Sequence, residues 1–509
     1  MKKKKNTSFV FFILIAVLYG ALQPVSARDI GREKVWSGTT ELSSVSIRLG
    51  AQSGGPGNFL DIFSPNIYKG RKASRYAANI QLMYVFGRTS GANFFFPGSS
   101  AIRKYSKSVQ EKIDIWSERQ EGQMINLGNI REVFEGVNSV SDIRKAYARY
   151  RNEVYVKDGY KVAEQGPTDG LNKITEGDVI LLHLYGREAF AALKVKEIVP
   201  GAGGSIAFDI KYGKSDAGTG GENFVTKTPG EQGDWQVGTT YADTHYQSEY
   251  LVGDFPLILS APHGGGMNPL NIPDRDCPGA VRGTDMRTIE LTREIQKILI
   301  KEYGVRPHVV VSNLSRRKID LNREIGPGTC GNAAARPAWQ QYHNYLDTAI
   351  AVARRDHKRV LLLDIHAHAH TIQRLELGYL INGKAIRDAY RGKDLETLAG
   401  TSSLTNIIPE NEGSSLHPML FGAKAFGTLA GNNSIPSVPS QQDPYPKDGE
   451  KYLSRGYITQ HYTSPDYPEV HGIQVEINRS VRSDGARVEA AKRMAKTIME
   501  YMRSQQLTD

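Results

Sequence analysis

The second half of the chain alternates short apolar runs with amphipathic helices, and this alternation restricts the fold more than any other feature. Strands this short, with helices between them, are typical of a buried sheet that is covered on both faces. The sequence therefore predicts an α/β domain with a mostly parallel or mixed sheet. We expect strands at Pro256–Pro262, His308–Ser312, Val360–Asp364, Leu375–Ile381 and Gly472–Ile477, and helices at Thr288–Tyr303, Pro337–Asp356 and Gly485 to about Gln505.

The chain of 509 residues is too long for one ordinary domain. Strand-like runs and a helix after Ser139 predict an α+β region of unknown role over residues 28–160. Three further runs with tight turns predict a small β-barrel-like unit, which a Gly-rich linker at 213–238 follows. We therefore divide the chain into residues 1–27, 28–160, 161–240 and 241–509.

The first 27 residues have the pattern of a secretory signal peptide. MKKKK is followed by the apolar stretch Ser8–Leu18 and by a small-residue cleavage site at Val25–Ala27. Removing these four lysines lowers the formal net charge from +10 to +6, so the basic charge does not point to nucleic acid. We expect a periplasmic or secreted protein that keeps no stable membrane span after removal of the signal.

Two cysteines, Cys277 and Cys330, are the only ones in the chain. An even pair in an exported protein is compatible with one disulfide. A disulfide also requires close Cα atoms, which the sequence does not report. The pairing therefore stays open at this point.

Polar side chains follow several of the predicted strands. In α/β sheets, ligands bind beyond the carboxyl ends of the strands. His263 follows the first run and precedes three glycines, which permit a close approach of the backbone. Glu476 ends the apolar run GIQVE, where it is either paired in a salt bridge or acts as a general base.

The stretch RVLLLDIHAHAH offers three histidines after one strand. Neutral imidazole is a good zinc ligand, and the nearby Asp364 would fix its tautomer. Alternation along an extended chain puts His366, His368 and His370 on one side, so spacing alone does not choose among them. We favour His366, because it lies nearest the strand.

An acidic metal ligand has two candidates, Asp285 and Glu290. Asp285 directly precedes a predicted helix, where it could instead act as the N-cap. Glu290 falls on the polar face of that helix, where solvation would explain it. We favour Asp285. Arg323 has the planar group that binds a carboxylate through two hydrogen bonds, although a surface pair with Asp320 is the plainer interpretation.

Five short motifs, in this order, resemble the N-formylglutamate amidohydrolase family over residues 253–505. They are Pro262-His263-Gly264, Gly283-Thr284-Asp285, Asp320-Leu321-Asn322-Arg323, Asp364-Ile365-His366 and Gln474-Val475-Glu476-Ile477-Asn478-Arg479. The resemblance implies a three-layer α/β/α fold like that of zinc carboxypeptidases. It further implies zinc held by His263, Asp285 and His366, with Glu476 as the catalytic base. Asn322 with Arg323 would hold a substrate carboxylate, and Arg323 would orient it for catalysis.

We therefore expect an exported zinc-dependent amidohydrolase that cleaves a carbon–nitrogen bond. Its substrate would carry a carboxylate, as in an N-acyl amino acid, a γ-glutamyl compound, a cell-wall peptide or another cell-envelope polymer. The alternative is an exported peptide- or glycan-binding protein that keeps a hydrolase fold without turnover. The export signal and the long stretch Gly383–Gly456 depart from a cytoplasmic metabolic enzyme, and they leave the substrate open.

Overall fold

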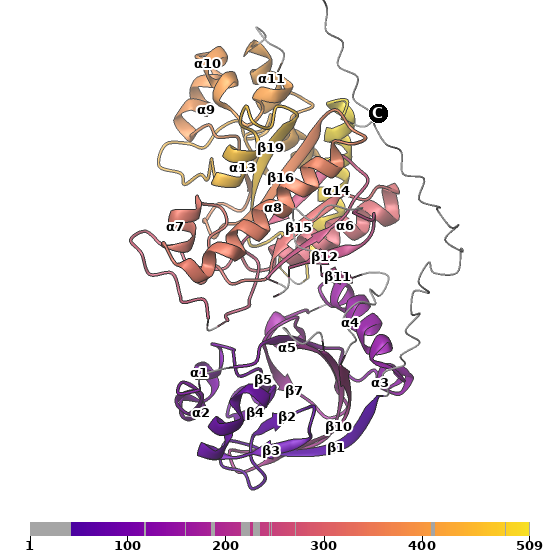
Figure 1. The fold of residues 1–509 in the computed structure, drawn as a ribbon. Coiled ribbons are helices and arrows are strands. Elements are labelled where there is room, and N and C mark those ends of the chain that lie inside the picture. Colours follow the sequence, from indigo (N-terminus) through magenta and orange to yellow (C-terminus); the bar gives the residue numbers. More distant parts are fainter. Residues whose placement is uncertain are drawn as a thin grey trace, which may run out of the picture. The chain divides into compact units, whose positions relative to one another are not determined.

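A computed structural model gives the arrangement of most of the chain (Figure 1). The predicted signal peptide, and most of the predicted linker at 213–238, lie outside the described residues. The structure describes residues 42–116, 119–157, 159–184, 189–214, 224–226, 235–243, 245, 247–269, 271–408, 413–483 and 485–507.

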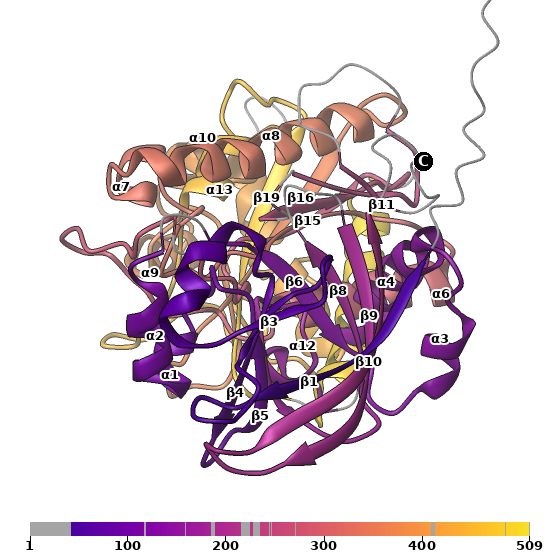
Figure 2. The ribbon, with the colours of Figure 1, turned by 60° about the horizontal axis from the view of Figure 1, so that its bottom comes forward.

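Two five-stranded sheets form the region before residue 215, and Figure 2 shows the strands of one of them side by side. The first sheet has the order β1-β10-β9-β8-β6, and the second has the order β3-β2-β4-β5-β7. Their apolar faces form one shared core. The strands are β1 (Ser43–Gly50), β2 (Phe59–Asp61), β3 (Asn66–Tyr68), β4 (Leu82–Gly87), β5 (Gly91–Phe95), β6 (Gly122–Asn126), β7 (Gly170–Ile174), β8 (Val179–Leu184), β9 (Ala189–Val199) and β10 (Ser205–Lys214).

Several helices accompany these sheets, and most of them are short. The longest is α4, with 15 residues. The helix predicted after Ser139 is confirmed as α4, and the Ser139 hydroxyl accepts a hydrogen bond from the Asp142 N–H, as an N-cap does. The helices are η1 (Gly70–Asn79, a 3-10 helix), α1 (Ile102–Tyr105), α2 (Lys107–Ile113), α3 (Arg131–Gly136), α4 (Val140–Val154) and α5 (Val162–Gln165).

Strands from both sides of residue 160 build these two sheets. β7 pairs with β5, whereas β8 pairs with β6, so each sheet combines an early strand with a later one. The structure therefore distributes the strands differently from the predicted division at residue 160. The reason is that antiparallel pairing joins segments that are distant in the sequence, which local turn patterns do not report.

A nine-stranded mixed sheet forms the second half of the chain, with the order β11-β12-β13-β15-β14-β16-β19-β17-β18. Its four central strands run parallel. The architecture is thus mixed α/β, as predicted. The strands are β11 (Phe224–Thr226), β12 (Thr240–Ala242), β13 (Ser248–Leu251), β14 (Leu257–Ala261), β15 (His308–Ser312), β16 (Val360–Ala367), β17 (Leu375–Gly378), β18 (Ser437–Val438) and β19 (Val470–Ile477).

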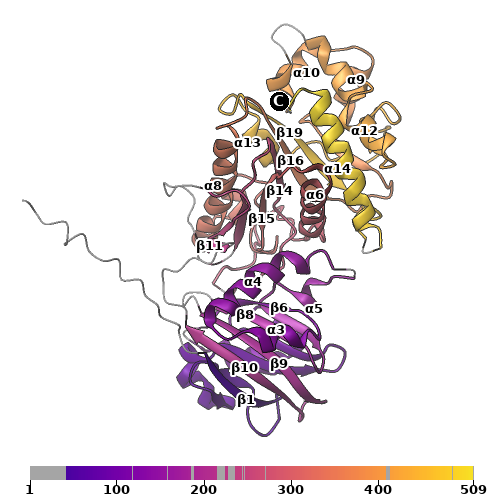
Figure 3. The same cartoon turned by 90° about the vertical axis from the view of Figure 1, so that its right-hand side faces the viewer.

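Helices pack on both faces of this sheet (Figure 3). Alternate side chains of β14, β16 and β19 pack with α6 (Thr288–Tyr303) and α14 (Arg487–Ser504) in one core. The intervening side chains pack with α8 (Arg336–Ala353) and α13 (Tyr457–Tyr462) in another. The remaining helices are α7 (Ile325–Thr329), η2 (Ala333–Ala335), α9 (Gly383–Tyr390), α10 (Leu395–Thr401), η3 (Thr405–Ile407), η4 (Gly413–Ser415), α11 (Leu416–Phe421) and α12 (Phe426–Asn432).

The chain changes direction across the sheet between β14 and β16. After β14 it passes through α6 to β15 on one side of β14, and then through α8 to β16 on the other side. Such a switch opens a crevice at the carboxyl ends of the two strands, and ligands bind there in open α/β sheets. His263 follows β14 and His366 lies near the end of β16, so both histidines belong to this switch.

The interpretation of Glu290 as a solvated surface residue is wrong. Its side chain is buried, and so is that of Glu294, although both lie on the polar side of α6. Residues of the region before residue 215 cover this side, where the buried Arg487 donates a hydrogen bond to the Tyr155 carbonyl oxygen. A helix pattern distinguishes polar from apolar faces, but it does not report that a second part of the chain covers the polar one.

Cys277 and Cys330 form a disulfide, with their Cα atoms 5.4 Å apart. This resolves the pairing that the sequence left open. The bond joins the segment after His263 to the C-cap of α7. Within the described residues, no helix has the length and apolar character that crossing a membrane requires.

Glu249 on β13 ties α4 to α6 through buried ion pairs. Its carboxylate accepts hydrogen bonds from Arg151 and from Arg293, whose Nη2 lies 3.1 Å from Oε2. All three side chains are at most 4% exposed. Breaking a buried pair by removing one partner is costly, because it leaves buried charge without its counter-charge.

We predict that Glu249→Ala lowers the free energy of unfolding by about 3–5 kcal/mol, measured by urea unfolding with tryptophan fluorescence. The matched control is Glu153→Ala, which removes an exposed i,i+4 pair with Arg149. The control should cost about 0.5 kcal/mol or less. Equal effects of the two substitutions would contradict a stabilising role for the buried pairs.

Candidate metal centre

His263 reaches the switch point through a tightly packed turn. A Cβ on Gly264 would lie 2.6 Å from atoms of Ile289 and Thr288, and one on Gly265 would lie 2.2 Å from the Asn313 backbone. The glycines thus let the turn pack against α6 and the end of β15. The predicted close approach of the backbone is therefore seen at its contacts with α6 and the end of β15.

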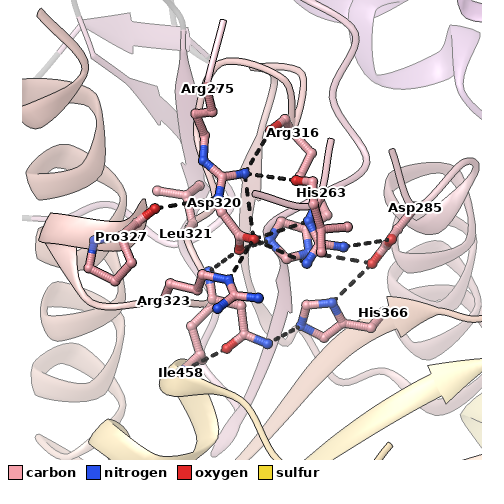
Figure 4. Close-up of polar contacts among 12 residues, drawn as sticks. His263, Arg275, Asp285, Arg316, Asp320, Leu321, Arg323, Pro327, His366 and Ile458 are labelled. Atoms are coloured by element: carbon pink, nitrogen blue, oxygen red, sulfur yellow. Dashed lines mark hydrogen bonds and ion pairs between the residues drawn. The ribbon is translucent and has the colours of Figure 1, made fainter. Parts of the chain in front are cut away.

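The imidazole of His263 is fully buried, and a carboxylate fixes its orientation. Its Nε2 donates to Asp320 Oδ1 at 2.8 Å (Figure 4). Since a carboxylate only accepts, the proton sits on Nε2 and the lone pair sits on Nδ1. That Nδ1 has no hydrogen-bond partner among the described residues, and it lies 3.4 Å from Asp285 Oδ2.

His366 repeats this arrangement from the neighbouring strand. Its Nε2 lies 2.8 Å from Asp364 Oδ2, and its Nδ1 lies 3.0 Å from Asp285 Oδ2. Burial alone would lower the pKa of His366, but the nearby carboxylates of Asp364 and Asp285 raise this pKa well above its ordinary value. These carboxylates therefore favour the positively charged form of the His366 imidazole.

Asp285 is the point where the two imidazoles meet. Burial would raise its pKa, yet His263 and His366 hold this pKa well below its ordinary range. The two Nδ1 atoms and the Asp285 carboxylate converge, and a cation that replaces the proton on His366 Nδ1 would have three ligands here. Tetrahedral ligands about 2.0–2.1 Å from zinc are about 3.3 Å apart. The separations of 3.4 and 3.0 Å match that spacing, so the donor set fits a zinc ion.

The sequence left the acidic ligand open between Asp285 and Glu290, and the structure places these two residues differently. Asp285 lies beside His263 and His366, whereas Glu290 lies beyond this group on α6 and its charge interacts with Arg487 and Arg287. Asp285 is not the N-cap of α6, because that position is Arg287.

His368 does not join His366, because β16 ends at Ala367 and the expected alternation stops there. Its Nε2 donates to the Arg374 carbonyl oxygen, and its Nδ1 accepts from the His370 N–H. His370 instead contacts Glu376, with Nδ1 2.7 Å from Oε1. Both ring nitrogens of His368 are therefore engaged in hydrogen bonds, unlike Nδ1 of His263.

Glu476 lies beside His366 in the register of β16 and β19. Its carboxylate is buried, and it accepts a hydrogen bond from Gln474 Nε2 at 2.9 Å. Burial raises the pKa of Glu476 to about 7, against the opposing charge of His366. A carboxyl group with this pKa can both accept and return a proton near neutral pH.

Arg316 was not singled out from the sequence, yet it faces both carboxylates of the centre. Its Nη1 lies 3.4 Å from Asp285 Oδ1, and its Nη2 lies 3.1 Å from Asp320 Oδ2. Asp320 itself was considered only as a partner of Arg323. Both residues precede the Asn322-Arg323 pair by only a few positions in the sequence, and this was the one signal that could have pointed to them. The hydrogen bond between Asp320 and His263 is not visible in the sequence.

The predicted carboxylate-binding pair lies at the same centre. The Asn322 amide nitrogen is 3.0 Å from His366 Nε2, and its Oδ1 accepts from the Ile458 N–H at 2.8 Å. Arg323 is 43% exposed and lies 3.3 Å from Asp320 Oδ2, so the pairing with Asp320 is confirmed. Arg323 also lines the cavity at this centre, and its binding of a substrate carboxylate stays a prediction.

One cavity of about 860 Å³ contains these groups. This volume is within the range of pockets that bind small molecules. Its wall includes Asp285, Arg316, Asn322, Arg323, His366 and Glu476, and it continues along α13 past Tyr457 and His461.

Residues 331–482 match the model of the N-formylglutamate amidohydrolase family. This confirms the resemblance that the sequence motifs indicated. His366 and Glu476 lie inside the matched residues, and the other proposed site residues precede them. The match supports an amidohydrolase-type function, the hydrolysis of a carbon–nitrogen amide bond.

Solved structures give weaker likenesses, and no curated protein matches the chain. The N-formylglutamate amidohydrolase from Ralstonia eutropha JMP134 is 13% identical, with a TM-score of 0.32, over 51% of this chain and 98% of that one. The CwlD amidase from Clostridioides difficile, solved in complex with the GerS lipoprotein, is 12% identical, with a TM-score of 0.23, over 49% of this chain and 99% of that one. These TM-scores are too low to carry an inference.

We predict that Asp320→Asn lowers zinc affinity by about 10–100-fold, because it removes the carboxylate that orients His263. Competition with a chromophoric chelator measures this affinity without any assay of turnover. Asp274→Asn is the matched control, since Asp274 pairs with Arg317 and Lys318 outside the cavity wall. An unaltered affinity in Asp320→Asn would contradict the orienting role.

Proposed function

We propose that the chain is an exported zinc-dependent amidohydrolase, which cleaves an amide or peptide bond in a carboxylate-bearing substrate. The observation that carries the proposal is the convergence of His263 Nδ1, Asp285 and His366 Nδ1 beside Glu476. Three protein ligands, with a fourth position left for water or substrate, are typical of catalytic zinc. A three-layer arrangement like that of zinc carboxypeptidases agrees with helices on both faces of the sheet.

His263, Asp285 and His366 would hold the zinc ion. Bound there, zinc supplies a Lewis acid that polarises the scissile carbonyl and lowers the pKa of a water towards about 7. Asp320 and Asp364 face the Nε2 atoms of the two histidines, and they would thereby orient both Nδ1 atoms for zinc.

Glu476 acts as the general base and then as the general acid. It accepts a proton from the attacking water, and it returns that proton to the nitrogen of the leaving amine. Its pKa of about 7 suits both steps. Arg316 lies against Asp285 at the cavity wall, where its positive charge stabilises negative charge that develops on the carbonyl oxygen.

Arg323 and Asn322 orient the substrate. The exposed guanidinium of Arg323 lines the cavity, and it can bind a carboxylate through two parallel hydrogen bonds. Holding the substrate in this way lowers the barrier by fixing the scissile bond near Glu476. A substrate with a carboxylate close to its scissile bond would therefore fit this arrangement.

Two features support a periplasmic or secreted location. The first 27 residues have a signal-peptide pattern. The disulfide between Cys277 and Cys330 is of a kind that persists in oxidising compartments.

We predict that Glu476→Gln lowers kcat by about 10²–10⁴-fold while the protein keeps its zinc, because only the proton transfer is removed. His263→Ala should lose both the zinc and the activity, because it removes a ligand. Zinc content is measured by elemental analysis, and hydrolysis is followed on N-formyl and γ-glutamyl amides.

His357→Ala is the control for loss of a histidine, because His357 lies outside the cavity wall and contacts the Asp254 carbonyl oxygen. It should keep both the zinc and the activity. A His263→Ala protein that is zinc-free and fully active would overturn the proposed mechanism.

A further inference from the structure

Arg275 is a buried arginine that no step of the proposed mechanism uses. Its side chain is 1% exposed, and it is not among the residues that line the cavity. Its Nη1 donates to the carbonyl oxygens of Val281 at 2.8 Å and Arg316 at 3.2 Å, and its Nη2 donates to that of Pro327 at 3.4 Å (Figure 4). All three acceptor residues line the cavity. One guanidinium therefore fixes three separate segments of the cavity wall from outside the cavity.

Asp320 is the carboxylate that lies closest to this guanidinium. Its Oδ1 accepts a hydrogen bond from His263 Nε2 at 2.8 Å. Its Oδ2 faces three guanidiniums, with Arg316 Nη2 at 3.1 Å, Arg323 Nε at 3.3 Å and Arg275 Nη1 at 3.7 Å. The two oxygens thus have different roles, because positive charge holds Oδ2 while Oδ1 orients the imidazole.

Burial separates the three arginines around Asp320. The side chains of Arg316 and Arg323 are 17% and 43% exposed, whereas that of Arg275 is 1% exposed. Solvent screens a pair of exposed charges, but it screens a buried pair much less. At 3.7 Å, Arg275 is too far from Oδ2 for a hydrogen bond, so this contact acts through charge. Arg275 also holds the backbone of Arg316, which makes the shortest of the three contacts.

The disulfide between Cys277 and Cys330 joins the segment of Arg275 to α7, which the guanidinium also contacts. Cys277 lies two residues after Arg275, and Cys330 is the C-cap of α7. The Gly328 carbonyl oxygen of α7 accepts a hydrogen bond from the Asp320 N–H at 2.9 Å. A Cβ on Gly328 would lie 2.6 Å from the Asp320 carbonyl oxygen, so these two segments pack tightly. The covalent bond therefore limits the movement of both Arg275 and Asp320.

We propose that Arg275 is a positioning residue for the metal centre, which acts through Asp320 on His263 and which the disulfide holds in place. Without the guanidinium, Asp320 Oδ2 is less firmly held, and Oδ1 orients His263 Nε2 less well. The imidazole then presents Nδ1 less accurately, and the affinity for zinc falls. The inference rests on the proposed function for the identity of the metal, but the orientation of His263 does not require a metal.

A double-mutant cycle on the full chain tests this role, with zinc affinity measured by competition with a chromophoric chelator. We expect Arg275→Gln to lower the affinity about tenfold. In the background of Asp320→Asn, the same substitution should cause no further loss, because its effect passes through that carboxylate. A merely structural role would lower the affinity by the same factor in both backgrounds.

Proton NMR of the zinc-free protein gives a second measurement, which needs no metal. The proton that His263 Nε2 donates to Asp320 should give a low-field signal, assigned by its absence in His263→Gln. In Arg275→Gln this signal should move upfield, because the hydrogen bond is weaker. The pair of substitutions Cys277→Ser and Cys330→Ser should move it in the same direction, with a smaller loss of zinc affinity.

Arg293→Gln is the matched control, because Arg293 is a buried arginine that pairs with Glu249 away from this cavity wall. It should lower the stability of the protein but keep both the zinc affinity and the low-field signal. A zinc affinity that Arg275→Gln leaves unchanged, losses that multiply in the double variant, or an unshifted signal would each overturn the proposal. An unsubstituted protein that binds no zinc, with a signal that shifts in Arg275→Gln, would sustain the positioning of His263 and refute the proposed function.

Discussion

The convergence of two carboxylate-oriented imidazoles on Asp285 is the interaction on which the centre depends. The Nε2 atoms of His263 and His366 face Asp320 and Asp364, so both rings direct Nδ1 at the same carboxylate. A buried carboxylate is unfavourable without positive charge, which a proton on His366 or a bound metal ion would supply. The fold maintains this arrangement because the histidines lie on adjacent strands, where the chain reverses its direction across the sheet.

The other polar groups of the cavity come from elements next to the two histidines. Glu476 comes from the strand beside β16, and Arg316, Asn322 and Arg323 come from the segment after β15. The disulfide joins this segment's neighbour, α7, to the chain after His263. Groups from five separate stretches of sequence thus meet in one cavity, and each stretch is fixed by a strand, a helix or a covalent bond.

The sequence predicted the elements that have strong periodicity. The helix Thr288–Tyr303 and the strand His308–Ser312 have the predicted bounds, because their apolar patterns end at clear turn residues. The strand that starts at Val360 continues three residues beyond the predicted end at Asp364. Its extension brings His366 onto the strand and excludes His368. What local patterns did not reveal were contacts between distant segments, such as the cover over Glu290 and the hydrogen bond from His263 to Asp320.

Anomalous X-ray scattering at the zinc edge, on crystals of the zinc-loaded protein, tests the central claim most directly. The account predicts one strong peak between His263 Nδ1, Asp285 and His366 Nδ1. A peak at the other cluster of potential ligands, His368, His370 and Glu376, with none at the first, would contradict it.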